Sequence, residues 1–490
     1  MTLAPTSSRS RSTTSLALSL ALAGGLAACA PAGSPGPSDS PDGGTDKDGG
    51  ERRCVQVPPR LGDTPAAKAL ASAPQQCDQP AYKWLDSQSL GDIASLGITD
   101  TIAAAASQVL LSAAKVQPAG PLHEVAVEQL GYLTQDRGKL ISATALMAYP
   151  SDGNRQSATD VLLVLHGTAG FTDRCAPSSD PDTRGLIAAL ASLGYVVIAP
   201  DYIGLRGVGV PTGFLHPYLI GQATAIAALD AVRAASKRLA MSGSPACAAT
   251  RFATVGGSQG GHAALWVDRL ASYYAPELTH VGVVATVPPA DLLSEGTRAL
   301  RAAVPATLNM AAFFGASSDW YGLKDRLSEV FVPPLDKDIP AALATSCDPS
   351  GTWSGKGLSD VFQKKLLDAA AVEGGVRGFG PWGCLAVENG LTTTSIPFVP
   401  SQRAGYGIMF VLGESDTLVN PPIERTSFDT LCASGLPLQY LECAGAGHVQ
   451  ATQWALPEIV DFLTDRYAGK ALDPAARCKR TPALRCRATP

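Results

Sequence analysis

The sequence has only six histidines, no Cys-x-x-Cys pair and no histidine-rich cluster. A structural zinc site needs closely spaced thiolate or imidazole ligands, so we expect no metal site. Its 38 basic residues, against 43 acidic ones, are scattered along the chain rather than gathered in one stretch. Because nucleic-acid binding requires a clustered basic surface, the sequence predicts no nucleic-acid partner.

What the sequence does contain is a globular composition, with 46% hydrophobic residues among 490. That fraction supplies enough apolar surface for a sizeable core. Folds with alternating strands and helices reach this length as one unit with insertions, so we expect one large core and an insertion.

Residues 1–28 have the features of an export signal. Two arginines precede a short apolar run, Leu16–Leu26, and Leu-Ala-Ala-Cys then ends at Cys29. This order is typical of a bacterial lipoprotein signal, in which the cysteine thiol is acylated and the chain is held at a membrane by the lipid. The run is short for a membrane span. An ordinary secretory signal with an incidental cysteine is the alternative. We therefore expect an exported lipoprotein, at the cell surface or in the periplasm.

Residues 29–53 are rich in Pro, Gly, Ser and Asp, which predicts a disordered tether. Ten cysteines follow it, and an even number in an exported chain predicts disulfides. Connectivity cannot be read from spacing. The local pairings that we consider reasonable are Cys432 with Cys443, Cys347 with Cys384, and Cys478 with Cys486.

From about residue 125 the chain alternates between apolar runs of strand length and helical patterns. This alternation predicts a mostly parallel sheet covered on both faces by helices. The segments 125–133 and 141–149, separated by a polar stretch, predict a hairpin. Further strands are expected at 161–165, 195–201, 252–255, 281–287, 407–412 and 438–441, and helices at 184–193, 222–239, 263–274 and 450–467.

The alternation lapses between residues 290 and 397, where aromatic residues occur among helical stretches and glycine-rich turns. We interpret this segment as a cap or lid inserted into the core; a second domain with its own core is the alternative. The core would then comprise residues 54–289 and 398–490, the latter ending in a disulfide-containing tail.

Ser258 is the candidate nucleophile. It lies in Gly256-Gly257-Ser258-Gln259-Gly260, between an expected strand and an expected helix. A sharp turn there lifts the hydroxyl above the sheet, and flanking glycines remove the side chains that would clash. The pentapeptide alone is common, so its placement carries the prediction.

A serine hydroxyl needs a neighbouring base, and in folds with this motif the acid and then the histidine follow the serine. Three histidines do so, namely His262, His280 and His448. Only His448, in a glycine-rich loop after the last expected strand, also follows a candidate acid loop. We therefore predict His448 as the base.

The acid should come from the loop after the preceding strand, Gly413-Glu414-Ser415-Asp416. We predict Asp416, with Glu414 as the competitor, because either carboxylate could orient the imidazole and stabilise its protonated form.

Backbone N–H groups are expected to stabilise the oxyanion. One belongs to Gln259, directly after the serine, and another to Thr168 or Ala169 in the loop after the early buried strand. We expect His166 to be a packing and hydrogen-bonding residue and Asp201 to be structural.

These residues resemble the secretory lipase family, of the fungal lipase A type. The resemblance spans about residues 161–467. Its most specific stretches are Cys175-Ala176-Pro177-Ser178, the sequence from Gly256 to Ala263, Tyr274-Ala275-Pro276-Glu277-Leu278, and the Asp416 and His448 loops with Cys432 between them.

The resemblance implies an α/β-hydrolase fold with an inserted helical cap and hydrolysis of esters, often acylglycerols, without a cofactor. It assigns catalysis to Ser258, Asp416 and His448, and oxyanion stabilisation to Gln259 and a residue near Ala169. The His-Gly-Thr loop and the lipoprotein signal depart from the family. The expected partners are an ester substrate and the membrane that holds the lipid anchor.

Three other functions remain open: a serine peptidase or acyltransferase with the same triad, a binding lipoprotein with a vestigial triad, and an attachment protein acting through its cap. All three triad residue types are present, which disfavours the last two.

Overall fold

The computed structural model describes residues 57–61, 65–72, 84–152, 158–241, 244, 246–401, 403 and 405–490. The signal, Cys29 and the tether predicted from the sequence lie outside the described residues. Within the described part, no helix combines the length and apolarity that a membrane crossing requires.

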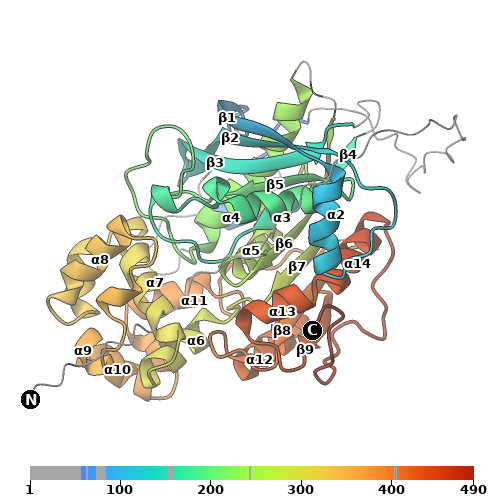
Figure 1. The fold of residues 1–490 in the computed structure, drawn as a ribbon. Helices are drawn as coiled ribbons and strands as arrows, with labels where there is room; N and C mark the ends of the chain where they lie inside the picture. The colour runs from blue at the N-terminus through green and yellow to red at the C-terminus, as the bar shows by residue number, and fades with distance from the viewer. Residues whose placement is uncertain are drawn as a thin grey trace, which may run out of the picture.

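One nine-stranded sheet forms the centre of the molecule (Figure 1). Its strand order is β1-β2-β3-β5-β4-β6-β7-β8-β9. The strands are β1 (Ile93–Ile102), β2 (Val125–Asp136), β3 (Lys139–Pro150), β4 (Thr159–Leu165), β5 (Val196–Pro200), β6 (Ala248–Gly257), β7 (Thr279–Thr286), β8 (Gly407–Gly413) and β9 (Leu438–Cys443).

The last six strands of this list, β4 to β9, run parallel. Every residue of β5 and β8 is buried, as expected for strands covered on both faces. Parallel strands end at a common edge, so the loops after β4, β6 and β8 gather on one side of the sheet. The predicted parallel sheet is confirmed.

The predicted hairpin is present, but its turn is shorter than the polar stretch suggested. Strands β2 and β3 pair antiparallel up to Asp136 and Lys139. The turn consists of Arg137 and Gly138, which have φ values of 49° and 76°. Two positive φ angles match the twist of the flanking strands, so the ladder continues to the turn.

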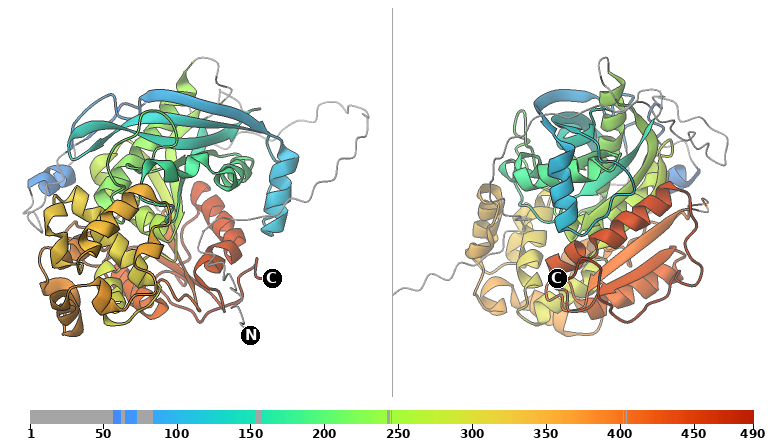
Figure 2. Two further views of the ribbon diagram at one scale, coloured as in Figure 1. Left: turned by 60° about the vertical axis from the view of Figure 1, so that its left-hand side comes forward. Right: turned by 45° about the vertical axis from the view of Figure 1, so that its right-hand side comes forward.

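Helices cover both faces of the sheet (Figure 2). Leu162 belongs to the buried cluster that includes side chains of α3, α13 and α14, whereas its neighbour Leu163 belongs to the cluster that includes side chains of α4, α5 and α12. Successive strand residues point to opposite faces, so these groups are two layers. The helices are α1 (Pro65–Ser72), α2 (Ala104–Ala113), α3 (Pro181–Ala191), α4 (Gly221–Ala240), α5 (Gln259–Tyr274), α6 (Leu292–Arg301), α7 (Ala306–Trp320), α8 (Leu335–Thr345), α9 (Leu358–Val361), α10 (Lys364–Ala371), α11 (Trp382–Asn389), α12 (Pro421–Ala433), α13 (His448–Trp454) and α14 (Leu456–Tyr467).

The single helix predicted over residues 450–467 is wrong. Helix α13 begins at His448 and ends at Trp454, and α14 begins at Leu456. Pro457 lies in the first turn of α14, where a missing N–H is tolerated, whereas inside a continuous helix it would remove a hydrogen bond. The break leaves α13 free to lie at a different angle from α14.

Helices α6 to α11 occupy the chain between β7 and β8, and none of the described residues there forms a strand of the sheet. They gather at one end of the molecule, in yellow and orange in Figure 1. Aromatic pairs join them: Phe314 meets Trp382 edge to face, at 5.7 Å between ring centroids. Their buried side chains form one continuous cluster with those of α4 and α5.

The disulfides differ from the three local pairings considered above, which are wrong. Between described residues, bonds join Cys175 to Cys347, Cys432 to Cys478, and Cys443 to Cys486, and Cys247 and Cys384 are disulfide-bonded as well. The C-terminal tail turns back along β9, where Leu484 exchanges backbone hydrogen bonds with Glu442 and Ala444. Tail cysteines therefore meet cysteines of α12 and β9 rather than each other.

Removing the bond between Cys175 and Cys347 with a double alanine variant is expected to lower the free energy of unfolding by roughly 2–5 kcal/mol. This disulfide closes a loop of 172 residues, whereas that between Cys432 and Cys478 closes one of 46. In the chain-entropy account the longer loop contributes about 1 kcal/mol more. Urea unfolding of both double variants measures this; an equal or reversed order would contradict the entropic explanation.

Candidate active site

Ser258 stands in a strained turn between β6 and α5. Its φ and ψ angles are 58° and −121°, a conformation that side-chain-bearing residues rarely adopt. The glycines around it are sterically required: a Cβ at Gly256 would lie 2.2 Å from Gly260 O, and one at Gly260 would lie 2.0 Å from Leu165 O. The Ser258 N–H donates to Thr286 O at 2.9 Å and ties the turn to β7. This is the geometry of a nucleophile elbow.

Asp416, which is buried, and His448, which is partly buried, form a pair at the same edge of the sheet. His448 Nδ1 lies 2.7 Å from Asp416 Oδ2. Asp416 belongs to the loop after β8, residues 414–420, which we call the acid loop. Its other oxygen, Oδ1, accepts the N–H groups of Leu418 and Val419 at 2.8 and 3.0 Å. An acceptor carboxylate on Nδ1 fixes the tautomer that leaves Nε2 as a base.

The competing carboxylate, Glu414, has a different partner. It is exposed, and its Oε2 accepts the N–H of Gly445 at 2.8 Å. Asp416, not Glu414, therefore faces the imidazole.

Helix α13 brings His448 toward the serine turn. Thr452, one turn after His448, has its Oγ1 2.5 Å from that of Thr286, and a Cβ on Gly257 would lie 3.2 Å from the same Thr452 atom. Nε2 of His448 is buried and has no hydrogen-bond partner in the described part of the chain, so no bond to Ser258 is formed there. The nitrogen that would act as base is thus free.

The other two histidines that follow the serine are engaged elsewhere. His262 Nε2 lies 2.7 Å from Asn389 O. His280 contacts Thr254 Oγ1 at 2.9 Å and Asp268 at 3.6 Å.

Gln259 begins α5, and the first N–H groups of a helix have no partner within it. Its side-chain amide is fixed by His216, with 2.6 Å between Gln259 Nε2 and His216 Nε2. His216 Nδ1 lies 2.9 Å from Ile203 O. Burial lowers the pKa of His216 to about 3, so the ring is neutral and can accept from the amide. Sequence reasoning missed His216, since it precedes the serine and belongs to no motif.

The second predicted oxyanion segment is held by Tyr218, whose OH lies 2.9 Å from Thr168 Oγ1 and accepts Asn309 Nδ2 at 2.9 Å. Asn309 belongs to α7, so this contact joins the loop after β4 to the helices between β7 and β8. The N–H groups of Thr168 and Ala169 donate to no acceptor among the described residues.

His166 and Asp201 occupy supporting positions. Burial lowers the pKa of His166 to about 4, and its ring stacks on Tyr202. Asp201 is fully buried and accepts from Ser178 N, Ser178 Oγ and Thr144 Oγ1 at 2.6–2.7 Å. Burial raises its pKa to about 6. These contacts tie the end of β5 to neighbouring loops.

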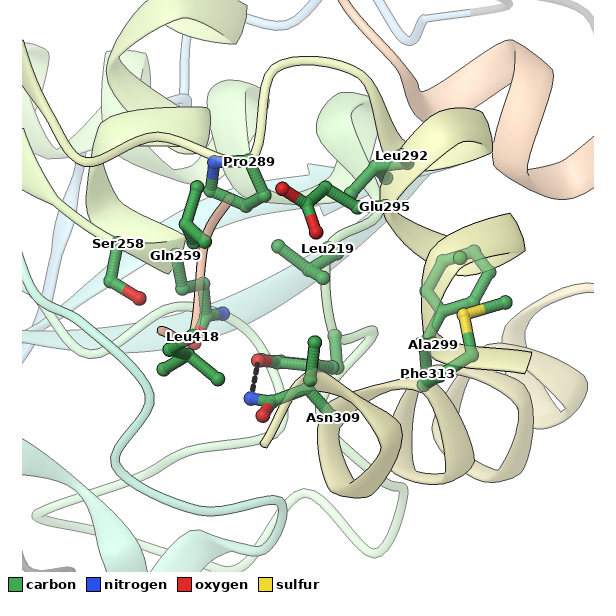
Figure 3. Close-up of a pocket in the computed structure, with 15 residues that line it drawn as sticks. Leu219, Ser258, Gln259, Pro289, Leu292, Glu295, Ala299, Asn309, Phe313 and Leu418 are labelled. Atoms are coloured by element: carbon green, nitrogen blue, oxygen red, sulfur yellow. Dashed lines mark hydrogen bonds between the residues drawn. The ribbon is translucent and has the colours of Figure 1, made fainter. Parts of the chain in front are cut away.

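A mostly apolar pocket opens beside Ser258 (Figure 3). Ser258 and Gln259 lie at one side, and side chains of α6 and α7 form the other. Glu295 is its one charged lining residue. The lining consists of Tyr218, Leu219, Ser258, Gln259, Pro289, Leu292, Glu295, Gly296, Ala299, Ala306, Asn309, Met310, Phe313, Leu418 and Val419.

In the described ranges, no three His, Cys, Asp or Glu side chains are grouped so that they could hold a metal ion.

Comparison with known sequences supports the resemblance to secretory lipases. The family model described as secretory lipase matches residues 182–344, about a third of the chain, which includes Ser258. A protein named probable inactive lipase from Mycobacterium tuberculosis is 25% identical over 291 residues, covering 59% of this chain and 58% of that protein. A secreted triacylglycerol lipase of Malassezia globosa, LIP7, is 26% identical over 364 residues, covering 69% of each chain.

Solved structures show the same fold. The rice cell wall degrading esterase LipA from Xanthomonas oryzae superposes with a TM-score of 0.59 at 17% identity, covering 77% of this chain and 97% of that one. Candida antarctica lipase A in its closed state gives 0.60 at 16% identity, covering 86% and 92%. The predicted α/β-hydrolase fold is confirmed.

Proposed function

We propose that this chain, which has the α/β-hydrolase fold and resembles the secretory lipases, is an exported serine hydrolase of carboxylic esters. The observation that carries the proposal is the part-buried hydrogen bond between Asp416 and His448 at the sheet edge where the strained Ser258 turn stands. The adjoining apolar pocket offers a place for the acyl group.

The reaction proceeds through an acyl-enzyme. His448 Nε2 takes the proton of Ser258 Oγ as the oxygen attacks the ester carbonyl, and Asp416 stabilises the imidazolium. The N–H of Gln259 and that of Thr168 or Ala169 bind the oxyanion. The imidazolium then gives its proton to the leaving alcohol, and a water activated by the same nitrogen hydrolyses the acyl-enzyme.

The helices of residues 292–389 are part of this proposal as a cap over the serine, since α6 and α7 supply much of the pocket wall. Export is supported by the disulfides, which persist in oxidising compartments. Attachment to a membrane through an acylated Cys29 remains part of the proposal.

Purified protein assayed with p-nitrophenyl esters of increasing acyl length, beside aminoacyl amides, tests this function. We expect ester turnover with kcat/KM at least about 100-fold above that of the amides, because the apolar pocket offers no counter-charge for a peptide terminus apart from the ion-paired Glu295. One relative is named probable inactive lipase, so the decisive result is whether this protein turns over esters at all. Absence of ester hydrolysis, or preference for amides, would overturn the proposal.

A further inference from the structure

Two residues of α6 form an ion pair beside the active site. Arg298 Nη2 lies 2.7 Å and Arg298 Nε 3.0 Å from Glu295 Oε2, one helical turn apart. Glu295 is 6% exposed and lines the pocket, whereas Arg298 does not line it. The proposed mechanism uses neither residue.

Both side chains also hold the backbone of the acid loop. Asn420 N donates to Glu295 Oε1 at 2.6 Å, and Arg298 Nη2 donates to Leu418 O at 2.6 Å. The ion pair thus binds one backbone N–H and one backbone carbonyl oxygen of the acid loop. The path of this loop sets the direction in which the Asp416 carboxylate points.

The same stretch of loop fixes the Asp416 carboxylate directly. The N–H groups of Leu418 and Val419 bind Asp416 Oδ1, and Oδ2 faces His448. A continuous set of hydrogen bonds therefore runs from α6 through the backbone at Leu418 to Asp416 and the imidazole.

The charges around Glu295 explain why it needs its partner. Burial raises the pKa of its carboxyl, and the negative charge of Asp416 adds to this, while Arg298 and the Asn420 N–H act in the opposite direction. Glu424 lies close by, and burial together with Glu295 raises its pKa well above the usual range. A carboxylate left unpaired in this acidic, buried surrounding would be costly.

We propose that Glu295 and Arg298 are positioning residues, which hold the acid loop at Leu418 and Asn420 and so keep Asp416 aimed at His448. This inference rests on the proposed function for its catalytic meaning. Small displacements of a catalytic group cost large factors in rate, so a loop held at two points from a packed helix preserves the proton-transfer geometry. It also links the helices between β7 and β8 to the triad.

The test is Arg298→Met, with Glu295→Gln beside it. We expect kcat per phosphonate-titrated serine to fall about tenfold in Arg298→Met with KM changed less than about twofold, because Arg298 does not line the pocket. The pKa of His448, followed by NMR of labelled histidine in the intact protein, should fall by about half a unit or more, since a displaced carboxylate stabilises the imidazolium less. Only six histidines need assignment.

Arg326→Met is the matched control. Arg326 and Glu329 form an exposed pair with the same spacing, at 2.8 and 3.0 Å, and make no contact with the acid loop. Its His448 pKa and kcat should equal those of the parent. A purely structural role for Arg298 would lower the number of titratable serines or the unfolding temperature, but not the pKa of His448.

An unchanged His448 pKa in folded Arg298→Met overturns the positioning role. If that variant fails to fold, Arg298→Lys, which keeps the charge but cannot make all three contacts, must show an intermediate shift; no shift overturns the role equally. If the parent does not hydrolyse esters but the pKa of His448 still falls in Arg298→Met, the proposed function is refuted. The positioning role would then stand.

Discussion

Ser258→Ala is expected to lower kcat on esters by roughly 10⁴- to 10⁶-fold, because the hydroxyl that forms the acyl-enzyme is lost. Alanine keeps a Cβ, so the strained backbone at φ 58° should be retained and the protein should remain folded. Initial rates with a p-nitrophenyl ester, and labelling by a fluorophosphonate, measure the loss.

Ser434→Ala provides the control for this change. Ser434, directly after the end of α12, is an exposed serine whose Oγ donates to Thr430 O at 3.0 Å. Its activity and labelling should match those of the parent. Retained labelling of Ser258→Ala would place the nucleophile elsewhere and refute the assignment.

Asp416→Asn should cost on the order of 10⁴-fold in kcat. The amide has nearly the same shape as the carboxylate, but its NH₂ group can no longer accept the Nδ1–H, which favours the tautomer with the proton on Nε2. It also removes the charge that stabilises the imidazolium. Initial rates with a p-nitrophenyl ester give kcat and check this; a loss of less than about tenfold would refute the role of Asp416.

Glu414→Gln distinguishes the two carboxylates of the acid loop. Its side chain reaches Gly445 N rather than the imidazole, and the Gln oxygen can keep that hydrogen bond. We expect kcat within about twofold of the parent. A loss comparable to that of Asp416→Asn would reverse the assignment of the acid.

The elements that could be predicted from the sequence are those whose residues all face one environment. Strands β5 and β8 are buried along their whole length, so they read as unbroken apolar runs. Strand β1 was not predicted because it is an edge strand with no fully buried residue; burial alternates over residues 93–98, but Leu96 and Ile98 lie on the exposed side and are more than half exposed. Its sequence therefore lacks the apolar pattern by which strands are found.

The site divides in the same way. Ser258, Asp416 and His448 could be proposed because each follows a strand end, and parallel strands bring their ends to one edge. The partners that hold them could not: His216 meets Gln259, and Glu295 and Arg298 meet the acid loop, only through packing of separate elements. The predicted disulfide pairings were wrong for the same reason, because closeness in the sequence does not indicate the path of the C-terminal tail.

The disulfide that holds the C-terminal tail has a consequence for when the proposed activity first appears. Cys486 bonds Cys443, the last residue of β9, five positions before His448, and Leu484 runs beside the same residues. A chain whose thiols are still reduced lacks the cross-link that pins the tail next to the proposed base. We expect newly made protein to gain full activity only after meeting an oxidant, so the redox state of the compartment would set the time at which it matures.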